Sequence, residues 1–411
     1  MTDKHFLSDD IGPDRSVVEA AAAAPMLEQV LQWSAVNSGS RNLPGLSAMG
    51  SLLSDAFSVL PGDMERRPAA AVTSIAADGR EDSLSLGDNI LLTVRPDAPL
   101  QLLFTGHMDT VFPADSSFQH CSIDGDLLNG PGVADMKGGI AVMLAALRAF
   151  EGSPLAARIG YQVVLNSDEE IGSPGSASLL REAANGKQAA FTYEPSALPD
   201  GTLAGARPGS GNFSIIVTGR SAHAGRNPQD GRNAMLAAAD IALRLEQLAG
   251  EGLSVNPARI DGGGPNNVVP DQAILRVNMR PVSVDRQKIA EGAMQAILAT
   301  VAQAREVMIH VHGGFGRPPK MLDPQSLALL NMVSDCGRRL SQQIGWRDTG
   351  GVCDGNNIAA CGVPVVDTMG ARGGSIHSPD EYLIVPSLGE RAALTALLLC
   401  TLAREGVPRP V

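Results

Sequence analysis

Apolar residues along the first part of the chain form short runs that alternate with longer amphipathic or apolar segments. A short apolar run predicts a buried strand, and apolar residues three or four positions apart predict a helix. The strands expected are residues 100–104, 161–165 and 189–193, preceded by alternating segments between residues 69 and 94. The helices expected are two within residues 25–60, one at residues 138–150 and one at residues 176–184. Such alternation is typical of a mostly parallel sheet flanked by helices.

The pattern changes near Arg207. Residues 212–219 and 272–280 alternate strictly between apolar and polar side chains, as half-exposed antiparallel strands do. Amphipathic helices are expected at residues 231–248 and 284–304. We therefore predict a small inserted α+β domain at residues 207–317, whose sheet has an edge open to pairing with a second subunit.

The α/β pattern resumes after the inserted segment. The elements expected there are a helix at residues 324–340, a strand at residues 363–366 and a closing helix at residues 386–404. The fold class expected is thus α/β, with a mixed, mostly parallel sheet flanked by helices and formed jointly by residues 1–206 and 318–411. The polar residues 1–22 are expected to form a loose arm.

Composition narrows the classes of partner. The chain has 411 residues, of which 44% are hydrophobic, enough for a sizeable core in one large domain or two. The formal net charge of −12 argues against nucleic acid and anionic membranes as partners. The 5 cysteines lack the spacing of a disulfide framework or a cysteine–zinc site, which favours a reducing compartment. No signal peptide or membrane-spanning run is recognised, so a cytoplasmic location is expected.

Histidine and acidic residues follow several of the predicted strands. His107 and Asp109 come directly after the strand at residues 100–104, and Glu169 and Glu170 come shortly after the next core strand. Because the carboxyl ends of parallel strands meet at one edge of a sheet, these side chains are expected to gather there. The candidate metal ligands are His107, Asp135, Glu170, Glu194 and His377. Two imidazoles and three carboxylates suit two zinc ions that share one carboxylate.

Each of these residues also has an ordinary explanation when taken alone. Asp135 precedes a helix and would serve as its N-cap, although the flanking glycines suit a backbone bent around an ion. Glu169 and Glu170 would form a solvated acidic turn, whereas in a zinc site one would ligate the metal and the other would act as general base. Asp109 would accept the second N–H of the His107 ring, as carboxylates beside zinc sites do. The combination of candidates, rather than any one residue, favours a metal centre.

Six motifs occur in a fixed order along the chain: HMDTVFP, GPGVADMKGG, NSDEEIGS, YEP, GRSAHAG and GGSIHSPDEY. Together they resemble the motif series of the di-zinc exopeptidase and deacylase family. That family includes glutamate carboxypeptidases of the carboxypeptidase G type, acetylornithine deacetylase, succinyl-diaminopimelate desuccinylase and the aminoacylases. The resemblance covers residues 27–399, and its motifs are much more specific for the family than for the substrate.

The resemblance implies a role for each candidate ligand. Asp135 would bridge two zinc ions. His107 and Glu194 would complete one zinc site, and Glu170 and His377 would complete the other. The cofactors expected are therefore two Zn²⁺ ions per subunit, with Co²⁺ or Mn²⁺ as substitutes.

The resemblance also implies catalytic roles for residues that do not bind metal. Glu169 would be the general base, which takes a proton from the bridging water and later gives it to the leaving amine. Asp109 would orient His107. His223, in the inserted domain, would reach across a homodimer and stabilise the oxyanion at the neighbouring subunit's site. Taken alone, His223 would be an ordinary turn residue.

Residues of the inserted domain are the candidates for substrate binding. In the carboxypeptidase branch of the family an Asn and an Arg bind the α-carboxylate of the substrate, and Asn267 and Arg280 stand at the matching places. Arg317 is a candidate for a further polar contact. Arg280 lies on an alternating strand and would otherwise be an exposed charge.

Three positions depart from the family pattern. Met136 follows the bridging Asp135, where many relatives carry a second Asp joined through a cis peptide bond. Cys353 stands where Ser or Thr is usual, which we interpret as a conservative packing change. Thr202 lies near a position where the glutamate-specific branch carries a basic residue, which weakens the case for a glutamate product.

The sequence thus favours a zinc-dependent hydrolase that cleaves an amide or peptide bond adjacent to a free α-carboxylate. The partners expected are a small-molecule or peptide substrate and a second copy of the chain, with neither nucleic acid nor membrane. A rival within the enzymes is a biosynthetic deacylase of an acetylated or succinylated diamino acid. A rival of another class is a metal-free binding relative, which the complete set of candidate ligands disfavours.

Overall fold

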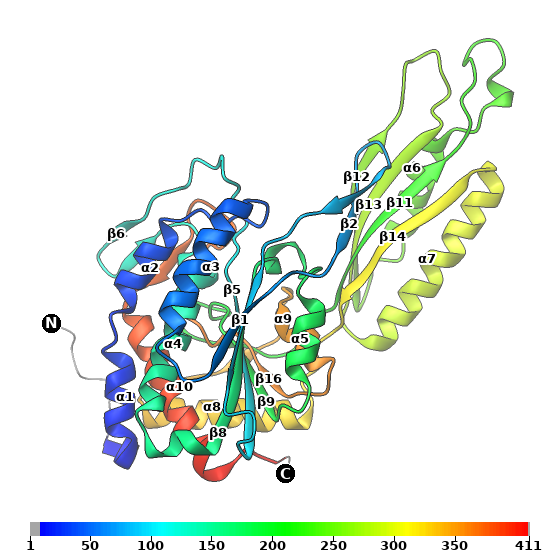
Figure 1. Cartoon of the computed structure of the whole chain (residues 1–411). Coiled ribbons are helices and arrows are strands. Elements are labelled where there is room, and N and C mark those ends of the chain that lie inside the picture. The colour runs from blue at the N-terminus through cyan, green and yellow to red at the C-terminus, as the bar shows by residue number, and fades with distance from the viewer. Residues whose placement is uncertain (1–8, 410–411) are drawn as a thin grey trace.

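The computed structural model describes residues 9–409, and its main body is built on a six-stranded sheet (Figure 1). The strand order is β1-β4-β8-β5-β9-β16. The bounds are β1 Asp63–Arg67, β4 Asn89–Val94, β8 Ile159–Asn166, β5 Leu100–His107, β9 Ala189–Thr192 and β16 Val365–Val366. The β1/β4 and β4/β8 pairs are antiparallel, and the β8/β5, β5/β9 and β9/β16 pairs are parallel. The predicted α/β class with a mixed, mostly parallel sheet is confirmed.

Helices cover both faces of this sheet because alternate side chains of each strand point to opposite faces. On β5, Leu102 and Phe104 belong to the main hydrophobic cluster, which includes residues of α1–α4, α8 and α10. Leu103 belongs to a second cluster, with residues of α5 and α9. The bounds are α1 Arg15–Ala22, α2 Met26–Ser34, α3 Leu43–Phe57, α4 Gly138–Glu151, α5 Ala177–Ala184, α8 Pro324–Arg339, α9 Asp354–Ala359 and α10 Pro386–Glu405.

A second sheet, of four antiparallel strands, projects from the main body (Figure 1). Its order is β12-β13-β11-β14, with β12 Leu253–Gly262, β13 Gln272–Pro281, β11 Ser210–Thr218 and β14 Met308–Arg317. α6 (Ala234–Glu246) and α7 (Val284–Arg305) pack on one face and share a hydrophobic cluster with the sheet that is separate from the main one. We call residues 207–317 the inserted unit. Its exact limits stay a prediction.

A hairpin of the main body lies against the inserted unit (Figure 1). It consists of β2 (Val72–Ile75) and β3 (Glu81–Leu84). Ile75 packs with Ile216 of β11 and Ile274 of β13, on the face of the second sheet opposite to the cluster of α6 and α7. The two parts of the chain are therefore joined by a packing contact as well as by covalent connections.

Two small sheets complete the main body. One has the order β17-β18-β7-β6, and the other pairs β10 with β15. The bounds are β6 Ser122–Asp124, β7 Leu127–Asn129, β10 Leu203–Ala204, β15 Trp346–Arg347, β17 Gly373–Gly374 and β18 Tyr382–Ile384. Among the helices of residues 9–409, none has the length and apolar character that crossing a membrane requires.

The expectation of a loose N-terminal arm is wrong where the structure describes it. A 3-10 helix at Asp9–Asp14 leads into α1, which buries Val17, Val18 and Ala21. These three residues lie on one side of a helix and pack in the main cluster, a periodicity that the neighbouring polar residues conceal. Residues 1–8 lie outside the described residues.

Candidate metal centre

Three neighbouring parallel strands deliver acidic and histidine side chains to one edge of the main sheet. β5 ends at His107, three residues beyond the predicted end at residue 104, because these last residues also pair with β8. β8 is followed by a 3-10 turn at Glu169–Ile171, and β9 is followed by Glu194. Because β8 and β9 flank β5 in parallel, these ends lie side by side.

His107, Asp135 and Glu194 form one group of potential ligands. Their ligand atoms all lie within 4.8 Å of one another. The Nε2 atom of His107 is 3.1 Å from Asp135 Oδ1 and 3.8 Å from Glu194 Oε2. The His107 ring is buried, and its Nε2 side faces the two carboxylates.

Asp135, Glu170 and His377 form a second group with the same spacing. The Nε2 atom of His377 is 3.3 Å from Asp135 Oδ2 and 3.1 Å from Glu170 Oε2. Asp135 therefore belongs to both groups and turns a different oxygen to each. Within residues 9–409 these are the two groups whose donor atoms suit a metal ion.

The electrostatics of the carboxylates favour a cation at the site. Burial and, to a lesser extent, the neighbouring Asp135 raise the pKa of Glu170 to about 8. Burial also raises the pKa of Glu169 to about 7, against the opposing effect of Arg317. Carboxylates packed this closely repel one another when ionised, and a bound cation removes that cost. The donor set thus fits divalent metal ions.

The imidazoles give the same indication. Burial disfavours the protonated ring of His107, yet Glu194 and the other nearby carboxylates raise the pKa of His107 well above its usual value. Hydrogen bonds to Asp135 and Glu170 raise the pKa of His377 to about 11. Both rings lie where the surrounding carboxylates attract a cation, whether a proton or a metal ion.

Asp109 contacts the other side of the His107 ring and also the turn that carries the two glutamates. His107 Nδ1 is 3.0 Å from the Asp109 backbone oxygen and 3.4 Å from Asp109 Oδ1. The backbone N–H groups of Glu169 and Glu170 donate to Asp109 Oδ1 and Oδ2, at 3.1 and 3.2 Å. Ser40 Oγ donates to Oδ2 at 2.7 Å. The sequence pattern predicted that the Asp109 carboxylate accepts the ring N–H, whereas the ring nitrogen lies closer to the Asp109 backbone oxygen. The contacts of Asp109 with Glu169, Glu170 and Ser40 are visible only in the folded chain.

Glu381 holds the loop that carries Asp135, a role that the sequence analysis did not predict. Its carboxylate is buried and accepts hydrogen bonds from the backbone N–H groups of Gly132, Ala134 and Asp135, at 3.1, 2.9 and 3.0 Å. Glu381 lies in the same GGSIHSPDEY motif as His377, which was the available signal.

The backbone around Asp135 differs from a simple helix start. The α4 helix begins at Gly138 with Lys137 before it, so Asp135 is not its N-cap. The Asp135–Met136 peptide bond is cis. A Cβ atom at Gly139, in the first turn of α4, would lie 1.8 Å from the Tyr193 backbone oxygen, so only glycine lets the start of α4 approach the end of β9.

The candidate residues of the inserted unit are split between its two ends. His223 is exposed, and Ala224 N donates to Asn267 O at 2.9 Å, so these two candidates share the end farthest from the main body. Arg280 is the ninth residue of β13, and its Nη1 atom donates to Gly350 O at 2.9 Å, next to the main body. A strand of this length spans about 30 Å. Asn267 and Arg280 therefore do not form a clamp within one chain.

Arg317 is buried and contacts Glu169 rather than open solvent. Its Nη2 atom is 2.7 Å from Glu169 Oε1 and donates to Glu169 O at 2.9 Å.

Cys353 is also buried, directly before α9, where its N–H donates to Asn356 Oδ1 at 3.1 Å. That position at a helix start explains why Ser or Thr is usual there.

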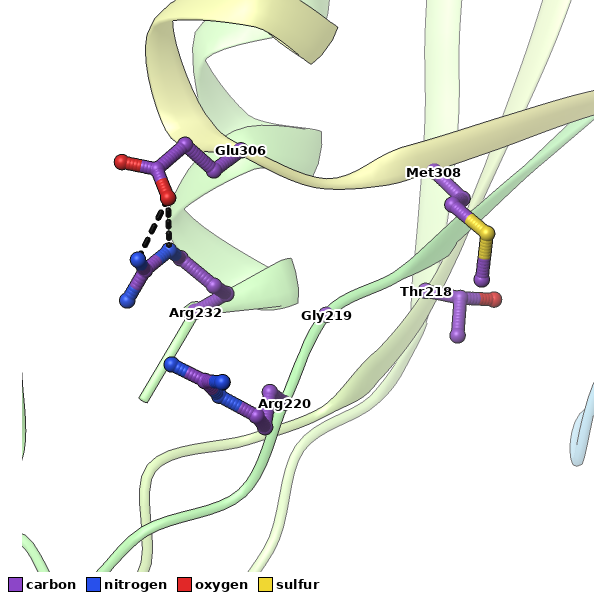
Figure 2. A pocket seen from close by; sticks show the side chains of 6 residues that line it. All are labelled: Thr218, Gly219, Arg220, Arg232, Glu306 and Met308. Carbon is purple, nitrogen blue, oxygen red and sulfur yellow. Dashed lines mark hydrogen bonds and ion pairs between the residues drawn. The ribbon is translucent and has the colours of Figure 1, made fainter. Parts of the chain in front are cut away.

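A cavity of about 220 Å³ lies elsewhere, in the inserted unit (Figure 2). Its 6 lining residues are Thr218, Gly219, Arg220, Arg232, Glu306 and Met308. Figure 2 shows the Arg232 guanidinium directed at Glu306, to which its Nε atom donates at 2.9 Å. None of the 6 belongs to the two ligand groups, so this cavity is not part of the metal centre.

The model of a protein family described as "Peptidase family M20/M25/M40" matches residues 103–401. The chain is similar to carboxypeptidase G2 of a Pseudomonas species, with 27% identity over 93% of this chain and 90% of that protein. It is also similar to the succinyl-diaminopimelate desuccinylase of Xanthomonas oryzae pv. oryzae, with 30% identity over 83% of this chain and 94% of that protein.

Solved structures show the same fold. A tripeptidase from Staphylococcus aureus superposes with a TM-score of 0.72 at 24% identity, over 92% of this chain and 98% of that chain. An M20 family metallo-carboxypeptidase from Sulfolobus solfataricus superposes with a TM-score of 0.68 at 14% identity, over 92% of this chain and 98% of that chain.

Proposed function

The chain belongs to peptidase family M20/M25/M40, and we propose that it hydrolyses an amide or peptide bond adjacent to a free α-carboxylate. Its family and its similarity to carboxypeptidase G2 make it a metal-dependent hydrolase of amide bonds. The observation that carries the proposal is the position of Asp135, whose two oxygens face two different ligand groups. Glu169 lies beside these groups and belongs to neither.

The proposed cofactor is a pair of zinc ions, for which Co²⁺ or Mn²⁺ would be substitutes. His107, Glu194 and Asp135 would hold one ion, and Glu170, His377 and Asp135 would hold the other. Two zinc ions at such a site supply Lewis acidity towards the substrate carbonyl and make a water easier to deprotonate.

Glu169 is the proposed general base. Burial raises its pKa to about 7, so the carboxylate can accept a proton and return it near neutral pH. Oε1 is engaged by Arg317, which leaves Oε2 to take the proton of the attacking water and to pass it to the leaving amine. Asp109 accepts a hydrogen bond from the backbone N–H of Glu169, which keeps Glu169 in place, and it orients His107 at the same time.

The proposed site is completed by a second subunit. His223 and Asn267 are exposed together at the far end of the inserted unit, where they cannot reach the metal centre of their own chain. We propose a homodimer in which His223 supports the oxyanion at the partner's site and Asn267 contacts the substrate's α-carboxylate there. Arg280, next to the main body, would bind the same carboxylate within its own chain.

The deacylase alternative rests on the similarity to succinyl-diaminopimelate desuccinylase, which is comparable in identity to that with carboxypeptidase G2. Thr202 bears on the choice between them. Its hydroxyl donates to Asp200 Oδ1 at 2.7 Å, near the position where a glutamate-specific relative would present a basic side chain. A released amino acid other than glutamate is therefore part of the proposal. The cytoplasmic location stays an expectation.

The proposal is tested by hydrolysis of a panel of N-acetyl, N-succinyl, N-benzoyl and peptidyl amino acids, each with a free or an amidated carboxylate. We expect cleavage only of the free-carboxylate members, lost after chelation and restored by zinc. Cleavage of amidated substrates at equal rates would reject the carboxylate requirement. Absence of cleavage with two bound zinc ions would place the substrate outside these classes.

The general base is tested by Glu169→Gln, which keeps the side-chain shape and removes the proton acceptor. We expect kcat to fall by about 10²–10⁴-fold with the zinc content unchanged. Glu182→Gln, at a glutamate whose side chain is 59% exposed, serves as the matched control and should keep wild-type rates. Wild-type turnover by Glu169→Gln would refute the assignment.

A further inference from the structure

Arg317 occupies the point where the chain returns from the inserted unit to the main body. It is the last residue of β14 and is only 5% exposed. Its Nη2 atom lies 2.7 Å from Glu169 Oε1 and donates to Glu169 O at 2.9 Å and to Ser173 Oγ at 2.8 Å. One guanidinium nitrogen therefore contacts both the carboxylate and the backbone oxygen of Glu169, the proposed general base.

A second carboxylate, that of Asp354, lies beside Arg317 and Ser173. Asp354 Oδ1 lies 3.5 Å from Arg317 Nη2 and accepts a hydrogen bond from the Ser173 hydroxyl. Its other oxygen accepts from Asn166 Nδ2 at 2.8 Å. Asp354 is buried, so its charge is balanced by Arg317 and its orientation is fixed by two polar neighbours. These shared hydrogen bonds restrict the rotamers of Arg317, Ser173 and Asp354.

The backbone that carries Arg317 is itself held in place. The Nδ2 atom of Asn356 donates to Pro208 O at 2.9 Å and to Pro318 O at 2.8 Å, which ties together the two strands that lead into and out of the inserted unit. Both Arg207 and Lys320 donate to the buried carboxylate of Asp367. The backbone on which Arg317 approaches Glu169 is therefore held firmly where the inserted unit joins the main body.

We infer that Arg317 is a positioning residue, which holds the Glu169 carboxylate in the orientation needed for proton transfer, and not the substrate-binding residue that the sequence predicted. The inference rests on the proposed role of Glu169 as general base. A glutamate side chain has three rotatable bonds, and misplacement of a reacting group by about 1 Å costs about 10²-fold in rate. Nη2 is already occupied by acceptors of the protein, and Nε of Arg317, which has no hydrogen-bond partner among the described residues, is buried away from a substrate.

The two roles predict different kinetics. If Arg317 positions the base, Arg317→Met lowers kcat by about 10²-fold while KM and the inhibition constant of the product amino acid stay within about 3-fold of wild type. Arg317→Lys, which can restore one of the contacts, recovers part of the rate. Added guanidinium should likewise restore part of the activity of Arg317→Ala. Arg280→Ala is the matched comparison, because a carboxylate contact there raises KM and the product inhibition constant.

A stability cycle tests the contact without any assay of activity. Urea midpoints are measured for wild type, Arg317→Met, Glu169→Gln and the double variant, with zinc content checked in each. We expect the double variant to lose clearly less than the sum of the single losses, because both substitutions remove the same ion pair.

The outcomes separate this inference from the proposed function. A raised KM and product inhibition constant with an unchanged kcat would overturn the positioning role in favour of substrate binding. Additive losses in the stability cycle would overturn the ion pair itself. A coupled cycle in a wild-type protein that cleaves none of the panel would support the Arg317–Glu169 pair and reject the proposed function instead.

Discussion

Asp109 shows how one buried carboxylate can serve several parts of a site. It contacts the His107 ring on one side and the backbone N–H groups of Glu169 and Glu170 on the other. A proposed metal ligand and the proposed base are thereby fixed to each other through a single residue. Residues that orient metal ligands in this way commonly affect metal affinity 10–100-fold when they are replaced.

Glu381 should have such an effect on the loop that carries Asp135. Glu381→Gln replaces one carboxylate oxygen by an NH₂ group, which then faces either the backbone N–H of Gly132 or those of Ala134 and Asp135, and a donor facing a donor costs about 1–3 kcal/mol. We expect metal affinity, measured by competition with a fluorescent chelator, to fall by about 10–100-fold. The exposed Glu182→Gln is the control, and equal affinities in the two variants would contradict this role.

At the scale of elements, the β2–β3 hairpin is the least expected connection. Arg276 of β13 donates through Nη2 to Ile75 O at 2.7 Å and to Ala76 O at 3.2 Å. Thr73 Oγ1 lies 3.0 Å from His312 Nε2 of β14. Together with the cluster of Ile75, Ile216 and Ile274, these contacts fix the inserted unit to the main body at a second place. The first place is the pair of chain segments that join residues 207–317 to the main body.

Removing the centre of this cluster should loosen the connection. Ile274 is fully buried, and Ile274→Ala is expected to lower the free energy of unfolding by about 2–5 kcal/mol. Hydrogen exchange of residues 72–84 should accelerate as the hairpin loses its packing partner. The matched control is Ile289→Ala, at a residue of α7 that is 59% exposed, for which a change within about 0.5 kcal/mol is expected. Unchanged exchange in the hairpin of Ile274→Ala would show that it is held by other contacts.

At the scale of the whole molecule, the proposed active site is larger than one chain. The metal centre, Glu169 and Arg280 belong to the main body or border it, whereas His223 and Asn267 lie at the opposite end of a strand of about 30 Å. If the function is as proposed, each site draws its oxyanion and carboxylate contacts from two subunits. Activity would then depend on assembly.

This dependence can be measured by mixing two inactive variants. Subunits carrying Glu169→Gln keep His223, and subunits carrying His223→Ala keep Glu169, so a mixed dimer contains one complete site. Co-expression of the two with different tags should restore about a quarter of wild-type activity, because about half of randomly formed dimers are mixed. Mixing Glu169→Gln with Asp135→Asn is the control and should restore nothing. Isolated mixed dimers without activity would contradict the role of His223 across subunits.

Much of the main fold could be predicted because its signals are local. Apolar runs such as 100–104 and 161–165 have the length and composition of buried strands, and α4 and α10 are so apolar that their helices begin and end close to the predicted residues. The strands β12 and β14 were missed because few of their side chains are buried, which weakens the alternation on which the prediction depends. The helix at residues 15–22 was missed because neighbouring polar residues conceal the periodicity of its three buried side chains.

The sequence by itself determined which residue types gather at the metal centre. Strand ends are fixed by local patterns, and the ends of parallel strands must meet at one edge, so His107, Glu170 and Glu194 could be expected together. Only the tertiary structure decided that Arg317 contacts Glu169, across 148 positions of sequence, and that Asn267 and Arg280 lie at opposite ends of β13. Such relations depend on how a strand is oriented in space and on what packs against it, and neither is encoded in the spacing of residues along the chain.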